Sequence, residues 1–205
     1  MFKSVGNKLA LHLVILLGCL VSLVGLPNHQ PQSQSQSTAI DVDRSSIMIH
    51  VSKSGVFSFA GDNHEIRASI ASGSVNETAK TVELKVDASK VTVLDPGLSQ
   101  DKRAQVQKEM LSADVLDSTR YPEIVFHSTQ VEQVKPGEWN VHGDLTLHGQ
   151  THPVTLHVTG GSGHYHGTAA FKQTDFGITP VTVAGGTIKV KDELKFDFDI
   201  ILRQQ

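Results

Sequence analysis

Apolar and polar residues alternate with a period of two through most of the chain after position 40. The pattern is clearest near the C-terminus, where every second residue from Leu194 to Leu202 is apolar and Lys195, Asp197 and Asp199 stand between them. Successive side chains of a β-strand point to opposite faces, so this pattern predicts strands with one buried face. The period recurs in the segments 46–51, 64–75, 82–86, 124–126, 139–148, 154–158 and 164–174.

These eight segments favour an all-β fold, a single eight-stranded antiparallel β-barrel with one inserted α-helix. Short turn sequences at 135–138, which contains Pro-Gly, and at 148–150 predict hairpins between consecutive strands. A sheet of eight strands can bury its apolar faces by closing on itself, which also removes exposed edges. A sandwich of two sheets is the alternative. The interior of such a barrel is either filled with side chains or holds one ligand.

One segment departs from the strand pattern and predicts the inserted helix, near Asp101 to Leu111. Ser99 is a suitable N-cap, and Asp101 would lie at the positive end of the helix dipole. Val106 and Met110 are one turn apart and share a face. We expect this short helix to pack across or beside the sheet.

The N-terminus, residues 1–26, has the composition of a secretory leader. Lys3 and Lys8 precede an almost wholly apolar run at 9–26. The run is also long enough to remain as a membrane anchor, and Leu-Leu-Gly-Cys at 16–19 resembles a lipobox in which Cys19 would be lipidated. All three interpretations place the body outside the cytoplasm, in the periplasm or cell envelope of a bacterium. The last two add a membrane tether through the N-terminus.

Two further regions follow the leader. Residues 27–39 are rich in Gln and Ser and predict a flexible linker, and residues 40–205 are the predicted barrel domain. The net charge is -3 and the basic residues are scattered, so we expect no nucleic-acid partner. Cys19 is the sole cysteine, so the body has no disulfide and no thiolate. No nucleophile turn or phosphate loop is present, so we predict no catalytic residue and no cofactor.

Histidine is abundant, with 11 residues, most of them in the second half. His164 and His166 share one face of a predicted strand, a spacing that metal sites use. His142, His148 and His157 fall on the polar side of their segments, which favours solvent-exposed side chains. We predict no metal site. The alternative function is a metal-binding envelope protein that uses these surface histidines.

Three motifs resemble the YceI-like family. Residues 121–129, Tyr-Pro-Glu-Ile-Val-Phe-His-Ser-Thr, resemble its Tyr-Pro-x-Ile-x-Phe-x-Ser segment, residues 143–154 match its next hairpin, and Asp-Phe-Gly-Ile at 175–178 its third landmark. The resemblance extends from about Ile40 to Leu202. It implies a lipocalin-like barrel, exported to the periplasm, with a polyisoprenoid in an apolar lumen. Gln173 replaces an Arg common in the family, and the adjacent Lys172 would face the other side of the strand.

The pattern alone makes the inward apolar residues a solid core, whereas the resemblance makes them the wall of a ligand lumen. We therefore predict a non-catalytic binding protein for an isoprenoid lipid or quinone-like ligand. An enzyme acting on isoprenoid substrates is a third hypothesis, and a homodimer is left open. The predicted lumen residues are Ile49, Leu84, Phe126, Trp139, Leu145, Leu147, Val154, Leu156, Phe196 and Phe198.

Overall fold

The computed structural model describes residues 36–54, 63–183, 185 and 188–204. The predicted leader, with Cys19, and most of the predicted linker lie outside these residues. None of the helices in the described part of the chain combines the length and apolar character of a membrane span.

The elements are mostly strands. In chain order they are β1 (Thr38–Ala39), β2 (Ser46–Ser54), β3 (His64–Ala68), β4 (Ile70–Asn76), β5 (Thr81–Asp87), a 3₁₀ turn (Ala88–Lys90), β6 (Thr92–Val93), α1 (Gln100–Leu111), β7 (Glu123–Lys135), β8 (Glu138–Leu147), β9 (Gln150–Gly161), β10 (His164–Lys172), a second 3₁₀ turn (Gln173–Phe176), β11 (Thr182–Val183) and β12 (Ile188–Ile201).

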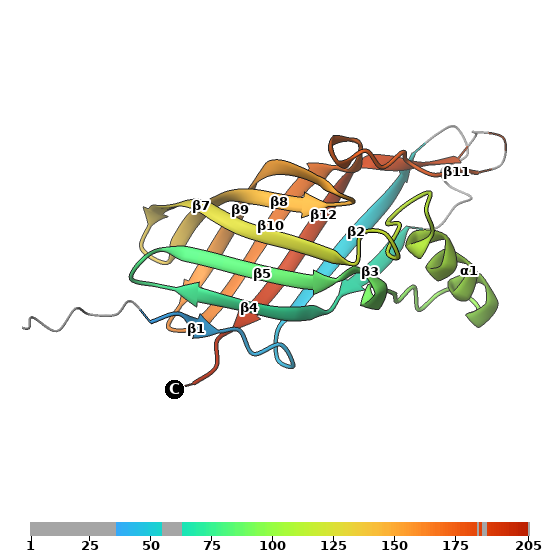
Figure 1. Ribbon diagram of the computed structural model, residues 1–205. Coiled ribbons are helices and arrows are strands. Elements are labelled where there is room, and N and C mark those ends of the chain that lie inside the picture. Colours follow the sequence, from blue (N-terminus) through green and yellow to red (C-terminus); the bar gives the residue numbers. More distant parts are fainter. Residues whose placement is uncertain (1–35, 55–62, 184, 186–187, 205) are drawn as a thin grey trace, which may run out of the picture. The chain divides into compact units, whose positions relative to one another are not determined.

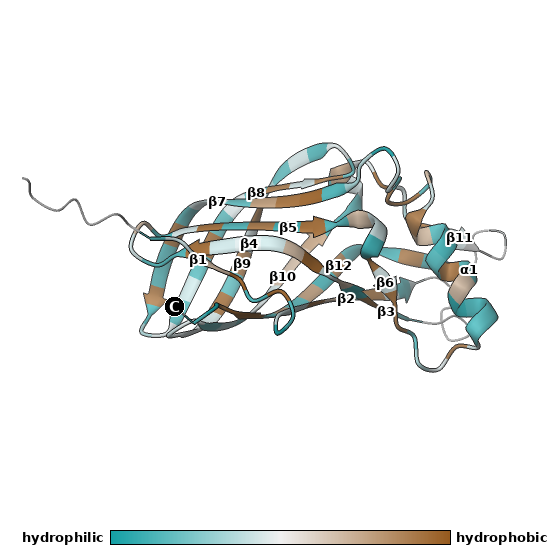
Figure 2. Ribbon diagram, turned by 60° about the horizontal axis from the view of Figure 1, so that its bottom comes forward, coloured by the Kyte–Doolittle hydropathy of each residue, from teal (hydrophilic) through white to brown (hydrophobic). Residues whose placement is uncertain are grey.

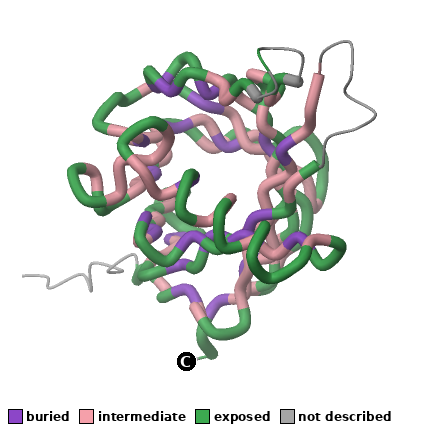
Figure 3. The backbone as a smooth tube through the Cα atoms, turned by 90° about the vertical axis from the view of Figure 1, so that its right-hand side faces the viewer, coloured by how far each residue is buried: buried purple, intermediate pink, exposed green. Residues whose placement is uncertain are grey.

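The strands form one antiparallel sheet in the order β1-β4-β5-β7-β8-β9-β10-β12-β2-β3-β6, with β11 beside β12. The strands near the two ends of this order, β4 and β3, are consecutive in the chain and form one bent strand. β3 pairs with β2, β4 pairs with β5, and Ser69 alone separates β3 from β4. The sheet therefore curls into a barrel (Figures 1 and 3).

The predicted fold class is confirmed. With β3 and β4 counted as one strand, eight long strands of the described chain surround a single interior: β2, β3–β4, β5, β7, β8, β9, β10 and β12. The remaining strands β1, β6 and β11 have two residues each. One continuous sheet rules out the sandwich alternative.

Both predicted hairpin turns connect neighbouring strands. Pro136 and Gly137 join β7 to β8, and His148 and Gly149 join β8 to β9. His148 and Gly149 have φ of 51° and 72°, the positive values of a type I′ turn, whose twist matches that of the flanking strands. This turn fixes the register of the hairpin, so that Val141 and Leu156 face the same side.

β12 shows how the alternation builds the barrel wall. Leu194, Phe196 and Phe198 line the interior, while Lys195 and Asp197 are exposed outside. Figure 2 shows the resulting mixture of hydrophobic and hydrophilic residues along each strand. Because the pattern has the same period as the strand, the sequence predicts which side chains face the interior.

The ends of the folded chain lie side by side at one end of the barrel. Thr38 and Ala39 pair with β4, although the sequence placed them in the linker. Ile40, the next residue, bridges to Leu202, and Arg203 N donates to Ala39 O at 2.9 Å. The prediction was wrong here because two residues are too few to show alternation, and their pairing with distant strands leaves no local signal.

The helix α1 lies beside β6 and β3 at the other end of the barrel (Figure 1). Ser99 is its N-cap and accepts from Lys102 N at 3.5 Å, as predicted. Met110 is buried, and Val106 packs against the same cluster. Gln107 attaches the helix to β6, because its side chain accepts from Val93 N at 2.7 Å and donates to Val91 O at 2.8 Å.

Candidate functional site

A cavity of about 1080 Å³ occupies the interior of the barrel. Its wall is mostly apolar and comes from strands all around the barrel and from α1. All ten predicted lumen residues lie on this wall; whether they contact a ligand stays a prediction. They are Ile49, Leu84, Phe126, Trp139, Leu145, Leu147, Val154, Leu156, Phe196 and Phe198.

Two inward-facing glycines keep aromatic rings against the wall. A Cβ on Gly143 would lie 2.4 Å from Cζ of Phe126, and a Cβ on Gly167 would lie 2.3 Å from Cζ of Phe198. Each ring therefore occupies the space above a glycine on a neighbouring strand. Because the rings lie on the wall instead of crossing the interior, room remains between opposite sides of the barrel.

Polar side chains line the cavity near its two ends. At the end that holds β1, the lining includes Glu77, Lys80 and Tyr165. The Tyr165 hydroxyl donates to Glu77, and its ring meets Trp139 edge to face with centroids 6.0 Å apart. Burial, and then the hydrogen bond to Glu77, raise the pKa of Tyr165 far above its ordinary value of 10.0. This phenol is therefore neutral at physiological pH and already has an acceptor.

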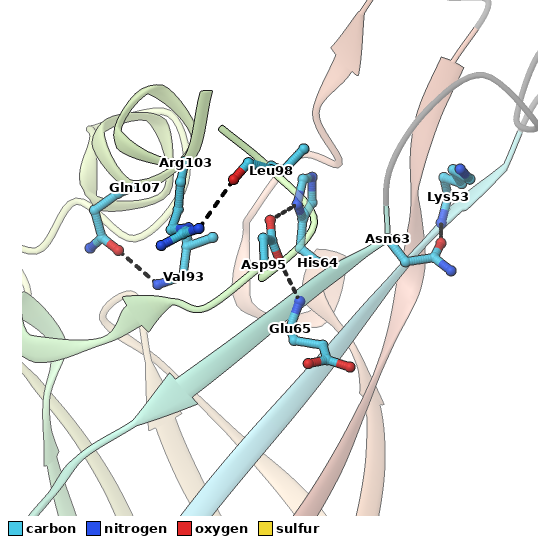
Figure 4. A network of polar contacts seen from close by, with 9 residues as sticks. All are labelled: Lys53, Asn63, His64, Glu65, Val93, Asp95, Leu98, Arg103 and Gln107. Atoms are coloured by element: carbon cyan, nitrogen blue, oxygen red, sulfur yellow. Dashed lines mark hydrogen bonds and ion pairs between the residues drawn. The ribbon is translucent and has the colours of Figure 1, made fainter. Parts of the chain in front are cut away.

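A histidine–aspartate pair with a buried carboxylate lies at the helix end of the cavity (Figure 4). His64 Nδ1 is 2.6 Å from Oδ2 of Asp95, whose other oxygen accepts from Glu65 N at 2.8 Å. The Asp95 side chain is only 3% exposed, and His64 lines the cavity. The carboxylate holds the ring with Nδ1 toward the protein, which leaves Nε2 for a ligand.

The neighbours of His64 complete a polar end to the cavity. Lys53 follows the inward-facing Val51 at the spacing of two that keeps it on the inner face of β2. Gln105 and Glu109 of α1 line the same cavity. An ammonium, an imidazole, an amide and a carboxylate can together bind a polar head group, whereas the wall beyond them suits only an apolar chain.

Sequence reasoning missed Asp95 and left His64 without a role. His64 faces inward like Ile66, and the sequence does indicate this, because residues two apart in a strand point to the same face. Its partner is 31 residues away and is placed by the pairing of β6 with β3, which no local pattern indicates.

Gln173 stands where the family often has an Arg, and its surroundings are clear from the structure. Gln173 is buried, lines the cavity and donates to Lys191 O at 2.8 Å. Lys172 is exposed, as the change of face predicted. A charged group from this position is therefore absent from the cavity wall, and Gln173 serves to join β12 to the turn after β10.

The histidines of the second half occupy two environments. His142 and His157 lie on the outer wall, as predicted, and bond Thr155 and Asn140 at 2.9 Å each. His148 is different. It belongs to the predicted turn after β8, and its half-buried ring contacts Phe176 O at 3.2 Å.

Comparison with known proteins agrees with this architecture. The model of the YceI-like domain matches residues 39–202. Over about 105 residues the chain is 37% identical to a UPF0312 protein of Pseudomonas putida (strain W619), and over 104 residues it is 34% identical to one of Vibrio cholerae (strain ATCC 39315). These alignments cover 46% and 45% of this chain and 55% of each relative, so the chain spans about half the length of the curated relatives it matches.

Among solved structures, BcnA of Burkholderia cenocepacia has the same fold. The TM-score is 0.60 at 17% sequence identity, and the match covers 79% of this chain and 98% of BcnA. The family model covers nearly the whole described barrel. The chain belongs to the YceI-like family.

Proposed function

We propose that this chain is an exported bacterial envelope protein that holds one long apolar lipid, of the isoprenoid or quinone type, and catalyses no reaction. The observation that carries the proposal is the apolar cavity of about 1080 Å³. Pockets for small ligands span roughly 300–1,000 Å³, so this volume suits a ligand at or above the upper end of that range. Burial of apolar surface, at roughly 25 cal/mol per Å², would supply most of the affinity.

We place the polar head group of this lipid at the helix end of the cavity. There His64 is held in one orientation by Asp95, and Lys53 adds a cationic donor. At the opposite end the Tyr165 hydroxyl already donates to Glu77. Beside α1, Lys53 can donate to a head-group oxygen such as that of a quinone carbonyl or a phosphate, and Nε2 of His64 can accept from a head-group hydroxyl, since Nδ1 of the ring faces Asp95.

The His64–Asp95 pair has the arrangement of a catalytic base, since an aspartate orients the histidine in many hydrolases. We assign it to binding because its neighbours on the wall, Lys53 and Glu109, are themselves suited to a polar head group, and the rest of the wall is apolar. The lipid is then a cargo whose bonds stay intact.

The envelope location rests on the N-terminal 26 residues. Their basic start and apolar run are the signals that direct a chain across the bacterial inner membrane. Whether the run is then cleaved, lipidated at Cys19 or kept as an anchor decides between a free periplasmic protein and a tethered one.

A bulky residue in the lumen tests the lipid-binding function. Leu145→Trp and Leu156→Trp should each lower the amount of lipid per mole of protein, measured by mass spectrometry of organic extracts from natively purified protein. The thermal midpoint of the delipidated barrel should change little, because the added ring enters free volume. Asp144→Trp is the matched control, since it places the same ring outside, on the strand that carries Leu145.

The alternative of a filled core gives the opposite pair of results. Overpacking a solid interior costs about 1–3 kcal/mol, so both lumen variants would then lose stability. A parent protein that carries no lipid, together with destabilised Trp variants, would refute the proposal.

A further inference from the structure

Three side chains meet on the outer wall where β10 and β12 pair. His164 and His166 project from β10, and Asp199 stands directly opposite His166 in the register of the two strands. Asp199 Oδ1 is 2.7 Å from His164 Nε2 and 3.6 Å from His166 Nδ1. In this group each residue offers a donor atom within 4.8 Å of the other two.

We propose that this cluster is a binding site for one divalent transition-metal ion of the zinc and copper class. Imidazole nitrogens with a carboxylate oxygen are donors that these ions accept, at metal–ligand distances of about 2.0–2.2 Å. Donors bound to one ion at such distances lie roughly 3–4 Å apart, so small rotations of three half-exposed side chains are enough to close the present spacing. The ion would take the place of the present hydrogen bond between His164 and Asp199.

The backbone under the cluster favours binding. Two neighbouring strands in the middle of the sheet hold the three Cα atoms, so little order has to be created when the ion arrives. The three side chains are 40–55% exposed, which lets an ion reach them from solvent. His166 and Asp199 also line a shallow outer hollow, where water can complete the coordination.

Other outer histidines lack this arrangement. His50 has one carboxylate partner, Asp197 at 2.6 Å, and His127 has Glu83 at 3.8 Å. In the described part of the chain no second group of three such donors meets the same spacing. The site therefore depends on the pair of imidazoles two residues apart and on the carboxylate across from them, and it is separate from the lipid cavity inside.

Calorimetric titration of untagged, EDTA-treated protein with Zn²⁺ tests the proposal. We expect one equivalent to bind, and at least a tenfold weaker association in His166→Ala and in Asp199→Asn. His127→Ala is the matched control, since it removes an exposed histidine beside a carboxylate on β7, three strands away from β10, and it should bind as the parent does. Nitrogen hyperfine structure in the Cu²⁺ spectrum should report two imidazoles in the parent and one in His166→Ala.

Binding that is weak and of several equivalents, or that Asp199→Asn leaves unchanged, would overturn the proposal and show adventitious ions only. The variants are at exposed positions, so their thermal midpoints without metal should equal that of the parent. Their lipid content should also be unaffected. A failure of metal binding is therefore distinguishable from a failure of the lipid-binding function.

Discussion

Single residues decide whether the interior of this barrel is open. Phe126 and Phe198 are large enough to cross part of the lumen, yet each lies over an inward-facing glycine of a neighbouring strand. Glycine is usually unfavourable inside a strand because it adds no packing surface. Here its missing Cβ provides the space for a ring, and the cavity is the result.

Gly143→Ala should close part of the cavity. The new Cβ would lie 2.4 Å from the Phe126 ring and 2.5 Å from His127 O, so the ring must turn into the lumen and the strand must shift. We expect a loss of about 1–3 kcal/mol in the free energy of unfolding and less bound lipid. Denaturant titration and lipid extraction measure the two effects.

Gly97→Ala serves as its control, because nothing lies within 4 Å of a Cβ at that position. Equal stability and equal lipid content in both glycine variants would show that the ring contacts do not shape the cavity.

Two histidine–aspartate pairs have equal contact distances but should contribute unequally to the free energy of unfolding, because only one of them is largely buried. His64–Asp95 and His50–Asp197 both have contacts of 2.6 Å, but the side chains of the first are 21% and 3% exposed and those of the second 41% and 59%. His64→Ala leaves a buried carboxylate short of a donor and should cost about 1.5–3 kcal/mol. His50→Ala should cost less than about 1 kcal/mol, because water replaces the lost partner.

Chemical denaturation of the two variants gives the comparison. If His50→Ala proved as costly as His64→Ala, burial would not be what gives the inner pair its strength. The same His64→Ala protein should also retain less lipid, since it lacks the proposed contact of Nε2 with the head group.

At the scale of elements, the helix illustrates how a polar side chain can attach one element to another. α1 has a single fully buried residue, Met110, so apolar packing alone secures it weakly. Gln107 compensates by accepting from Val93 N of β6 and donating to Val91 O, which immediately precedes β6. These two hydrogen bonds hold the helix over its end of the cavity.

Gln107→Ala should loosen α1 without opening the barrel. Val93 N and Val91 O would lose their partners, and such groups cost about 1–3 kcal/mol each when they stay buried. Hydrogen exchange should therefore quicken in α1 and β6 while the amides of β8 and β9 keep their rates. Lys108→Ala, an exposed position of the same helix, is the control. Uniformly faster exchange throughout the sheet would contradict this assignment.

Local patterns explain which elements could be predicted from the sequence. The α1 boundaries followed from the Ser99 cap, and the β8–β9 hairpin followed from its turn residues, because these signals lie within a few positions of each other. The inward residues of the site were predictable for the same reason, since parity along a strand is local. Asp95 and Asp199 were not assigned their partners, because strand pairing brings them to His64 and His166 from 31 and 33 positions away.

At the scale of the whole molecule, the N-terminal leader remains a prediction about residues outside the described part of the chain. We expect the mature protein from native cells to lack residues 1 to about 25, because the basic and apolar segments fit a cleaved leader. N-terminal sequencing of protein from periplasm and membranes tests this. A chain that begins at lipidated Cys19 would instead show a lipoprotein, and an intact Met1 would show a retained anchor.

The joining of the first strands to the last has a consequence for how the chain folds as it is made. β2 pairs with β12 along most of its length, and Ser45 and Ile201 exchange hydrogen bonds across 156 positions. Contacts between residues so far apart in sequence form slowly, because a long loop must first be closed. Until the final residues emerge, β2 has an unpaired edge that can join another chain. The protein therefore depends on remaining unaggregated until β12 has paired with β2, and removal of β12 should leave an open, association-prone sheet.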